Sequence, residues 1–368
     1  MTTEQLYLDS FLLLEELIRI PSFSKEENQT ADLLEFRLHS FGIKTERMHN
    51  NVWAKSKFFD PLKPTLLLNS HHDTVRPTGN WTDNPFAPVL NGEKMVGLGV
   101  NDAGASLVSL LAAFRFFYAK ELPFNLVFAA TAEEEISGEN GIEKVFKHFG
   151  KIDFAIVGEP TGMRVAVAEK GLLVLDCISK GKAGHAARNE GINAISQALN
   201  DILWFNTYRF EKASKWLEEV TMNVTVINGG TQHNVVPAEC TFTVDVRITD
   251  AYSIDEVLDI VQKNVSCEIH PRSKRLKPSG IDESHSLFRT ARSLGKTVFG
   301  SPTLSDQALL PVPSIKMGPG ESSRSHTTNE FIFLPELRQG IEGYIEFIQA
   351  LTQQELSNET LAEKYSFQ

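Results

Sequence analysis

The sequence predicts an α/β protein, with a mostly parallel sheet flanked by helices and an inserted ferredoxin-like α+β unit. Two observations support this prediction. Over residues 1–160, short apolar runs alternate with helical patterns, which is the βαβ order of a parallel sheet. From about Glu169 the apolar residues alternate along each run, as in half-buried strands, and these runs enclose two helical patterns. With 368 residues, 42% of them hydrophobic, the chain can form two cores.

The first part of the chain opens with two predicted helices. LDSFLLLEELIRI (8–20) has helical periodicity and stops at Pro21, and NQTADLLEFRLHSFG (28–42) ends on a glycine. A further helix is expected from about Ala103. The runs TLLLNS, NLVFAAT and DFAIVGEP predict buried strands, because a parallel strand covered on both faces is nearly continuous in apolar residues.

The middle of the chain has a different pattern of apolar residues, which alternate with polar ones. VAVAEKG, LLVLDCISK, VTVINGG and TFTVDVRI predict four strands, and GINAISQALNDILWF and SIDEVLDIVQKNV predict two helices; together they indicate the ferredoxin-like unit. Helices SHSLFRTARSLGKTV and LPELRQGIEGYIEFIQALTQQ then flank PSIKMG, a strand expected to return to the first sheet. We therefore predict one domain from residues 1–168 and 282–368, with residues 169–281 inserted. The polar tail after Leu356 is expected to fray.

Charge and cysteine content restrict the partners and the compartment. The formal net charge of −11 disfavours nucleic acid or an anionic membrane surface as a partner. We expect no membrane span, because no apolar run is judged to approach the required length, and the first ten residues lack the basic region of a signal peptide. The cysteines Cys177, Cys240 and Cys267 are odd in number and far apart, so neither a disulfide framework nor a thiolate metal site is expected. We expect a cytoplasmic protein.

Possible metal ligands follow the predicted strands of the first domain. They are His71 and Asp73 after TLLLNS, Asp102 after GLGVN, Glu133, Glu134 and Glu135 after NLVFAAT, Glu159 after DFAIVG, and His326 in SRSHTTNE. Each alone has an ordinary explanation, such as a helix cap or a solvated helix N-terminus. However, the carboxyl ends of parallel strands meet at one edge of a sheet. Carboxylates gathered there would repel one another unless a cation neutralised them.

These residue types indicate a particular metal site. Histidines and carboxylates without thiolates suit zinc or a similar divalent ion. Five ligands exceed the three of an ordinary mononuclear catalytic zinc, which favours two ions that share a bridging carboxylate. Glu134 beside Glu135 could then act as a general base. His71 is favoured over His72 as the ligand, because residues two apart on a strand share a face and H-x-D pairs His71 with Asp73.

The motifs together resemble a known family over about residues 10 to 350. They are H-x-D (71–73), G-x-G-x-x-D (97–102), T-A-x-E-E (131–135), V-G-E-P (157–160), G-K-A-G-H with G-I-N-A-I (181–195), N-V-V-P with D-V-R (234–247) and S-H-x-x-N-E (325–330). In this order they resemble the co-catalytic zinc metallohydrolases, which include acetylornithine deacetylase, succinyl-diaminopimelate desuccinylase, aminoacylase and glutamate carboxypeptidase.

The resemblance implies a role for each matching residue of the first domain. The implied ligands of two zinc ions are Asp102 as the bridge, Glu135 and His326 at one ion, and His71 and Glu159 at the other. Cobalt or another divalent ion could replace zinc. Glu134 would be the general base, and Asp73 would orient His71. The family commonly has Met-Lys-Gly after the bridging aspartate, whereas this chain has Ala103, Gly104 and Ala105, so any contact of that lysine is in doubt.

The resemblance also gives roles to three residues of the inserted segment. Taken alone, His185 would be a turn histidine and Arg247 a solvent-exposed arginine. In relatives, the histidine that matches His185 reaches into the partner subunit's active site and stabilises an oxyanion, which implies a homodimer formed through the inserted domain. Arg247 and Asn234 match the residues that bind the substrate carboxylate, and a guanidinium group can bind a carboxylate through two hydrogen bonds.

The expected reaction is hydrolysis of the amide bond of an N-acyl amino acid. Two zinc ions would polarise the carbonyl group, and Glu134 would move a proton from water to the leaving amine. N-acetyl-L-ornithine, an intermediate of arginine biosynthesis, is the preferred substrate because G-E-P-T and the motif layout look most like acetylornithine deacetylase. N-acetylcitrulline, N-succinyl-ornithine, N-succinyl-citrulline, N-succinyl-diaminopimelate and small peptides remain open. A metal-free amino acid-binding protein is the non-enzymatic alternative, which the complete ligand set argues against.

Overall fold

The computed structural model describes residues 2–188 and 190–365 and divides the chain into two compact units. Unit 1 runs to Val167, resumes over Gly280–Phe299, and resumes again at Ser305. Unit 2 consists of Ala168–Ser279 and the short segment Gly300–Leu304. The second unit therefore lies within the sequence of the first, and the chain passes between them four times.

The central element is a nine-stranded sheet with the order β1-β2-β6-β3-β7-β17-β8-β15, in which β16 also pairs with β8. Its strands are β1 (Thr45–Met48), β2 (Asn51–Lys55), β3 (Thr65–His71), β6 (Asn125–Thr131), β7 (Phe154–Gly158), β8 (Val165–Glu169), β15 (Ser279–Gly280), β16 (Val298–Ser301) and β17 (Ser314–Met317). Strands β6, β3, β7 and β17 are parallel, whereas β2 and β8 border them in antiparallel orientation. The predicted fold class, a mostly parallel sheet flanked by helices, is confirmed.

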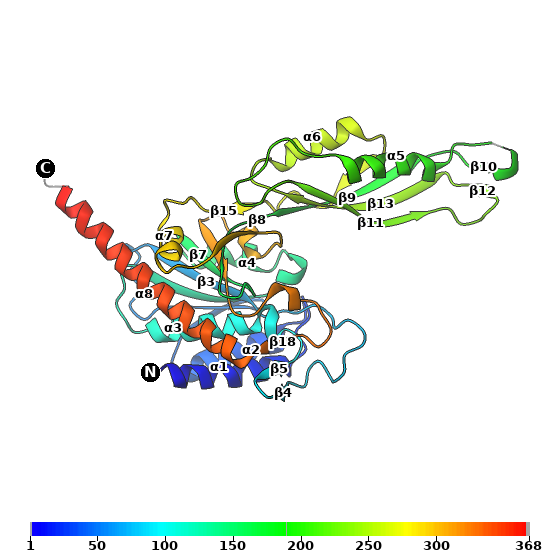
Figure 1. Cartoon of the computed structure of the whole chain (residues 1–368). Helices are drawn as coiled ribbons and strands as arrows, with labels where there is room; N and C mark the ends of the chain where they lie inside the picture. Colours follow the sequence, from blue (N-terminus) through cyan, green and yellow to red (C-terminus); the bar gives the residue numbers. More distant parts are fainter. Residues whose placement is uncertain (1, 189, 366–368) are drawn as a thin grey trace. The chain divides into compact units, whose positions relative to one another are not determined.

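Helices cover both faces of the parallel strands, which explains why these strands are apolar throughout. On one face, Leu67 and Val127 pack with Phe149, which follows α4 (Ile142–Val145) and η3 (Phe146–His148). Helix α3 (Ala105–Phe117) lies on the other face. The ring of its Phe114 is 5.9 Å from the ring of Phe128 on β6. Helices α1 (Thr3–Ile18) and α8 (Leu334–Tyr365) pack against α3, as Figure 1 shows. His71 shares the face of Leu67, because strand residues alternate between faces.

The other helices of unit 1 lie at the borders of the sheet. Helix α2 (Asn28–Ser40) packs against β1 and β2, and α7 (Ser286–Ser293) packs against β17 and α8. Helix α8 continues to Tyr365, through the polar tail that was predicted to fray. Glu359, Leu361, Glu363 and Lys364 of this segment are good helix formers, which fits the longer helix, and fraying of its end stays a prediction.

The stretch Val100–Phe117 is long and apolar enough to cross a membrane by length and composition. This corrects the expectation that no apolar run approaches that length. The stretch comprises α3 and the turn before it, and 89% of it is buried inside the protein. A helix that lies between a sheet and two further helices must be apolar on nearly all sides. Its position in the core therefore accounts for its composition.

A small three-stranded sheet lies beside the start of α3. It has the order β18-β5-β4 and consists of β4 (Val89–Asn91), β5 (Lys94–Val96) and β18 (Phe331–Phe333). The pairing of β18 with β5 is antiparallel, and Gly97 N donates a hydrogen bond to Glu330 O at 3.0 Å. This sheet therefore brings the S-H-x-x-N-E motif next to the G-x-G-x-x-D motif, although more than two hundred residues separate them in the sequence.

Unit 2 has the chain order β-α-β-β-α-β of a ferredoxin-like unit. Its elements are β9 (Gly171–Lys180), α5 (Ala194–Thr207), β11 (Thr221–Gly229), β13 (Glu239–Ile248), α6 (Ile254–Asn264) and β14 (Glu268–Pro271). The sheet order is β11-β13-β9-β14, and one core of buried side chains joins it to both helices. A separate pair of short strands, β10 (Gly184–His185) and β12 (Val235–Val236), forms a ribbon.

One of the four strands predicted for this unit was assigned wrongly. VAVAE forms β8 and pairs in the nine-stranded sheet, whereas the fourth strand of the ferredoxin-like sheet is β14. The sequence of β14, EIHP, is short, polar and ends in proline, so its pattern carries little strand signal. It is a strand because it pairs with the long β9.

Candidate active site

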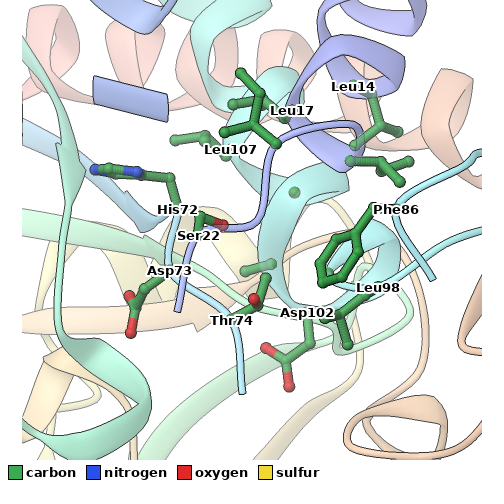
Figure 2. Close-up of a pocket in the computed structure, with 15 residues that line it drawn as sticks. Leu14, Leu17, Ser22, His72, Asp73, Thr74, Phe86, Leu98, Asp102 and Leu107 are labelled. Carbon is green, nitrogen blue, oxygen red and sulfur yellow. The ribbon is translucent and has the colours of Figure 1, made fainter. Parts of the chain in front are cut away.

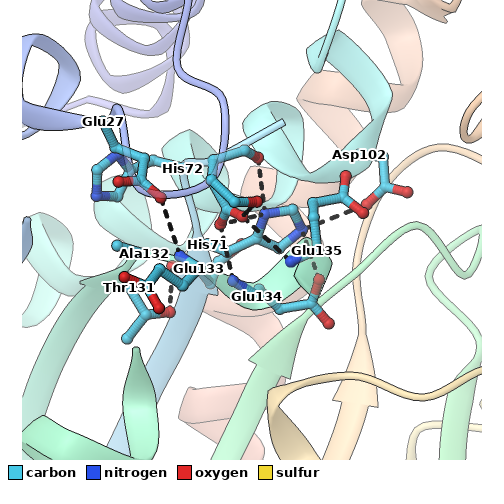
Figure 3. Close-up of polar contacts among 12 residues, drawn as sticks. Glu27, His71, His72, Asp102, Thr131, Ala132, Glu133, Glu134 and Glu135 are labelled. Atoms are coloured by element: carbon cyan, nitrogen blue, oxygen red, sulfur yellow. Dashed lines mark hydrogen bonds and ion pairs between the residues drawn. The ribbon is translucent and has the colours of Figure 1, made fainter. Parts of the chain in front are cut away.

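The predicted metal ligands come together in unit 1 although they lie on five separate segments. His71 ends β3, Asp102 lies in the turn η1 (Val100–Gly104) before α3, and Glu134 and Glu135 begin η2 (Glu134–Ile136) after β6. Glu159 follows β7, and His326 lies between η6 (Ser322–Arg324) and β18. Figure 3 shows Asp102, Glu134 and Glu135 arranged around the imidazole ring of His71. The carboxyl ends of the parallel strands β3, β6 and β7 therefore carry His71, Glu134, Glu135 and Glu159, whereas Asp102 and His326 come from the loops that follow β5 and precede β18.

Asp102 is at the centre of this cluster. Its Oδ1 lies 3.3 Å from His71 Nε2, and its Oδ2 lies 3.6 Å from His326 Nε2. Each carboxylate oxygen thus faces a different histidine, which is the arrangement that a bridging ligand requires. On the two sides of this bridge, Glu159 Oε1 lies 3.7 Å from His71 Nε2, and Glu135 Oε2 lies 2.8 Å from His326 Nε2.

Two sets of ligand atoms lie close enough together to hold a metal ion, within 4.8 Å of one another. One is His71, Glu134 and Glu159, and the other is His71, Asp102 and Glu135. Both sets differ from the predicted ones. The first contains Glu134, which was predicted to be the base, and neither contains the half-exposed His326, which was predicted to be a ligand. The six residues are neighbours, but their division between two ions stays a prediction.

The charge distribution of the cluster fits divalent cations. Burial raises the pKa of Glu134 and of Glu159 well above the usual range, and it also raises the pKa of Glu135. Burial works against a charged His71, but its hydrogen bonds to Asp102 and Asp73 and the nearby carboxylates raise its pKa well above the ordinary value. Such crowded carboxylates need positive charge nearby. Nitrogen and oxygen donors in this number suit zinc and related ions.

The raised pKa of His326 also shows that the surrounding carboxylates stabilise positive charge. Its hydrogen bond with Glu135, together with the charges of Glu135 and Asp102, raises the pKa of His326 to about 9. Its imidazole would therefore be protonated at neutral pH without a metal. A bound cation would replace that proton, because a ligating histidine must be neutral.

Asp73 contacts both His71 and the turn that carries Glu134. The Nδ1 atom of His71 lies 3.0 Å from the backbone oxygen of Asp73 and 3.4 Å from its Oδ1. The carboxylate of Asp73 accepts hydrogen bonds from the backbone amides of Glu134 at 3.0 Å and Glu135 at 3.1 Å. The predicted contact with His71 is present, and the support of the Glu134 turn is an additional function that the motif did not indicate.

His72 faces a different environment from His71. Its ring nitrogens lie 2.8 Å from Thr30 Oγ1 and 2.7 Å from the backbone oxygen of Asn50. Burial lowers the pKa of His72 to about 4, so its imidazole is neutral. In Figure 2 its ring points away from the carboxylates of Asp73 and Asp102.

Two buried carboxylates near the ligands carry roles that sequence reasoning missed. Glu330 is 1% exposed and accepts hydrogen bonds from the amides of Gly99 (3.1 Å), Asn101 (2.8 Å) and Asp102 (3.0 Å). Asp306 accepts from Asn69 Nδ2 at 2.8 Å and from Thr131 Oγ1 at 2.7 Å, and burial raises its pKa to about 6. The final glutamate of S-H-x-x-N-E was the only available signal for Glu330. The sequence indicated no role for Asp306, because its partners are distant in sequence.

The small residues after Asp102 are explained by close packing. A Cβ atom on Gly104 would lie 2.6 Å from the backbone oxygen of Gly99 and 2.9 Å from Leu14 Cδ1. The lysine that the family commonly has here could not be accommodated without moving this loop. Figure 2 shows the adjoining cavity between α1 and α3, about 20 Å³ in volume and lined by residues that include Leu14, Phe86 and Asp102. It is too small for an amino acid, and room for about one water remains.

The three predicted residues of the inserted segment all lie in unit 2. His185 pairs with Val235 in the β10–β12 ribbon, and the amide of Ala186 donates to Asn234 O at 3.1 Å, so His185 and Asn234 are close neighbours. Arg247 lies on β13, where it donates to Asp245 through Nε (2.8 Å) and Nη2 (3.0 Å). Since the metal ligands belong to unit 1, the contribution of these three residues to the site stays a prediction.

Histidines and carboxylates gathered beside the carboxyl ends of parallel strands are typical of metallohydrolases, and this is the class of protein that the fold and the site indicate. The sequence matches the model of Peptidase family M20/M25/M40 over residues 67–350. The chain therefore belongs to this family and is a hydrolase that acts on amide bonds.

Curated relatives differ in their named substrates. The chain is 28% identical over 321 residues to an acetylornithine deacetylase of Proteus mirabilis, covering 81% of this chain and 80% of the relative. It is 28% identical over 260 residues to a succinyl-diaminopimelate desuccinylase of Delftia acidovorans, covering 64% and 67%. It is 27% identical over 350 residues to a [LysW]-lysine/[LysW]-ornithine hydrolase of Sulfurisphaera tokodaii, covering 92% and 94%.

Solved structures share the fold. A tripeptidase from Staphylococcus aureus superposes with a TM-score of 0.77 at 21% identity, covering 94% of this chain and 99% of that one. A dinuclear metal-binding peptidase of the M20 family from Bacillus subtilis superposes with a TM-score of 0.70 at 17% identity, covering 95% and 99%. At these identities the likeness is one of fold.

We predict opposite effects for two substitutions in the cluster. Glu134→Ala should lower kcat by about 10²-fold to 10⁴-fold while metal stays bound, because a general base moves protons without being needed as a ligand. Asp102→Ala should lose metal, since it removes the carboxylate that faces both histidines. Metal content and kcat of both purified variants test this. Glu139→Ala, an exposed glutamate near the same turn, is the control. Wild-type turnover by Glu134→Ala would remove the base assignment.

A second prediction concerns the glycine after Asp102. Gly104→Ala should lower the free energy of unfolding by about 1–3 kcal/mol, the usual result of overpacking, and should weaken metal binding by moving the Asp102 loop. The backbone φ of Gly104 is −53°, which any residue adopts, so the effect would come from contacts alone. Denaturant unfolding and metal titration measure it. Gly79→Ala, where a Cβ atom meets nothing within 4 Å, is the control, and equal behaviour of the two variants would contradict the packing argument.

Proposed function

We propose that this chain is a zinc-dependent hydrolase of N-acyl amino acids, with N-acetyl-L-ornithine as the substrate in arginine biosynthesis. The observation that carries the chemistry is the arrangement of Asp102 between His71 and His326, with Glu134 beside it. The likeness to an acetylornithine deacetylase over 81% of the chain supports the substrate. The products would be L-ornithine and acetate.

The residues of unit 1 would divide the chemical work. His71, Asp102, Glu135, Glu159 and His326 would hold two divalent ions, which when bound supply Lewis acidity to the scissile carbonyl and to water. Glu134 Oε2 lies 3.9 Å from His71 Nε2, so its carboxylate belongs to the same cluster and would be within reach of a water held there. Glu134 would take a proton from this water and deliver it to the leaving nitrogen. Its burial favours the protonated form that this transfer creates.

The residues of unit 2 would recognise the rest of the substrate. Arg247 uses Nε and one hydrogen of Nη2 for Asp245, and no described residue hydrogen-bonds to its Nη1. The edge of the guanidinium group formed by Nη1 and Nη2 could therefore bind the substrate carboxylate through two hydrogen bonds. Asn234 would assist this contact, and His185 would stabilise the oxyanion.

The proposal includes a homodimer formed through unit 2. Strand β11 is an edge strand of the sheet, and edge strands offer unpaired backbone groups to another chain. Val226 and Ile227 on this strand are 50% and 51% exposed, and Leu199 and Leu203 on α5 are 55% and 62% exposed. Helix α5 packs beside β11, so these apolar side chains lie on neighbouring elements. A second copy of this chain would cover them.

Hydrolysis of a [LysW]-lysine or [LysW]-ornithine conjugate is the second candidate function. The relative so named matches 92% of this chain, more than the deacetylase does. Both candidates release ornithine or a related amino acid from an amide. A cytoplasmic location fits either, and the cysteines Cys177, Cys240 and Cys267 are all free thiols, as in a reducing compartment.

The substrate prediction is tested by steady-state kinetics of the zinc-loaded protein on a matched panel. The panel contains the N-acetyl and N-succinyl forms of ornithine, citrulline and diaminopimelate, together with several dipeptides. We expect N-acetyl-L-ornithine to give the highest kcat/KM, by roughly tenfold or more over the succinyl form, because an acyl pocket discriminates by such factors. A preference for dipeptides would replace the deacetylase proposal with a peptidase.

The dimer prediction is tested by light scattering on a double variant. The wild-type chain of 41.0 kDa should have twice this mass in solution, and Leu199→Glu with Leu203→Glu should return it to the monomer mass. Leu62→Glu, at a leucine that is 93% exposed in unit 1, is the control and should stay dimeric. A monomeric wild type would contradict both the dimer and the role of His185 in a partner's site.

A further inference from the structure

The turn that carries Glu134 and Glu135 is fixed by hydrogen bonds to its backbone. Three consecutive amides donate to buried carboxylates: Glu133 N to Glu27 Oε1 at 3.2 Å, Glu134 N to Asp73 Oδ1 at 3.0 Å, and Glu135 N to Asp73 Oδ2 at 3.1 Å. Glu133 has a φ of +59°, in the left-handed region that residues other than glycine rarely adopt. The surroundings must therefore hold this turn in place.

Glu27 is placed to hold the first residue of the turn. It lies at the start of α2, 106 residues before Glu133, and it is 0% exposed. Its Oε1 also accepts a hydrogen bond from Lys25 N at 2.6 Å, and its Oε2 accepts one from Asn50 Nδ2 at 2.8 Å. Burying a carboxylate is unfavourable, so a carboxylate kept at this position needs a reason beyond filling space. The hydrogen bond to the left-handed Glu133 supplies one.

Ser24, on the same segment, reaches the other carboxylate. Its hydroxyl donates to Asp73 Oδ2 at 2.7 Å, the same oxygen that accepts from Glu135 N. The segment is itself anchored beside Asp73, because Thr74 N donates to Ser22 O at 2.8 Å. The short connection between α1 and α2 thus takes part in both sets of contacts that hold the turn. It supplies one of the two carboxylates, Glu27, and its Ser24 hydrogen-bonds to the other, Asp73.

We propose that Glu27 and Ser24 are positioning residues for the general base. Glu27 holds the backbone of Glu133 in its left-handed conformation, and Ser24 fixes the carboxylate of Asp73 that orients the next two amides. Together they direct Glu134 towards the ligand cluster and Glu135 towards His326. This inference rests on the proposed role of Glu134 as the base, and it adds the N-terminal segment to the residues that control catalysis.

The test compares Glu27→Ala and Glu27→Gln in the metal-loaded protein. Glu27→Ala should lower kcat by about 10-fold to 100-fold with KM changed less than about threefold and with metal retained, because small misplacements of a catalytic group have effects of this size. Glu27→Gln should recover most of kcat, since its amide oxygen can still accept from Glu133 N. Ser24→Ala should give a smaller loss of the same kind.

Hydrogen exchange gives a readout that needs no substrate. In Glu27→Ala, peptides that cover residues 131–137 should exchange faster than in the wild type and in Glu27→Gln. The matched control is Asp201→Ala in unit 2, which removes a carboxylate that is 4% exposed and accepts from Ser266 N (2.9 Å) and Cys267 N (3.0 Å). It should lower the free energy of unfolding without changing kcat or the exchange of residues 131–137.

The outcomes separate the positioning role from the proposed function. If Glu27→Ala keeps wild-type kcat and wild-type exchange at residues 131–137, the positioning role is wrong. The same holds if Glu27→Gln fails to restore kcat, or if Glu27→Ala behaves like Asp201→Ala. If the wild type hydrolyses no member of the substrate panel, the proposed function fails, and the exchange comparison still decides whether Glu27 holds the turn.

Discussion

Mutual repulsion among buried carboxylates is the constraint on which the site depends. Asp102, Glu134, Glu135 and Glu159 all approach His71, and burial raises the pKa of the three glutamates. In a protein interior such a group is tolerated only where positive charge compensates it. The fold therefore places these carboxylates where binding of cations would be strongly favourable. The negative charge of these carboxylates also explains the raised pKa values of His71 and His326, which would be neutral as metal ligands.

A second layer of carboxylates holds the backbone around the predicted ligands. Glu330 accepts hydrogen bonds from three amides around Asp102, and Asp73 accepts from the amides of Glu134 and Glu135. The ligands on these turns lie outside the regular hydrogen bonding of the strands, so the turns need other partners to stay rigid. Burial acts to raise the pKa of Asp73, but its hydrogen bond with His71 lowers that pKa overall, so Asp73 is a charged acceptor, which forms stronger hydrogen bonds than a neutral one. Burial raises the pKa of Glu330 to about 8, so Glu330 holds its three amides largely as a neutral acceptor at neutral pH.

The two units divide the requirements of the proposed reaction. Unit 1 contains every predicted metal ligand and the predicted base. Unit 2 contains His185, Asn234 and Arg247, together with the exposed apolar side chains of α5 and β11. The curated relatives include an acetylornithine deacetylase and a succinyl-diaminopimelate desuccinylase, and a tripeptidase shares the fold. The substrates that these three names indicate differ, although this chain resembles all three proteins.

The sequence by itself determined the fold class, the family and the candidate ligands. Buried parallel strands are recognisable because they are apolar throughout, and His71, Asp102, Glu135 and Glu159 each follow such a strand or a glycine turn at short, fixed spacing. Their recognition needed only local pattern. The same approach misplaced the strand VAVAE and missed β14, because strand pairing is a property of the sheet and not of the segment.

Only the tertiary structure decided which groups support the ligands. Glu27 and Asp306 look like ordinary acidic residues in the sequence, and Glu330 was recognisable only as the end of a motif. Glu133, which donates to Glu27, lies 106 residues from it, and the partners of Glu330 and Asp306 lie 228 to 231 and 175 to 237 residues away. The structure also explained Gly104, since the space for its side chain is taken by Leu14 and by the backbone of Gly99. Such contacts depend on where distant segments pack against one another, and no local pattern records that packing.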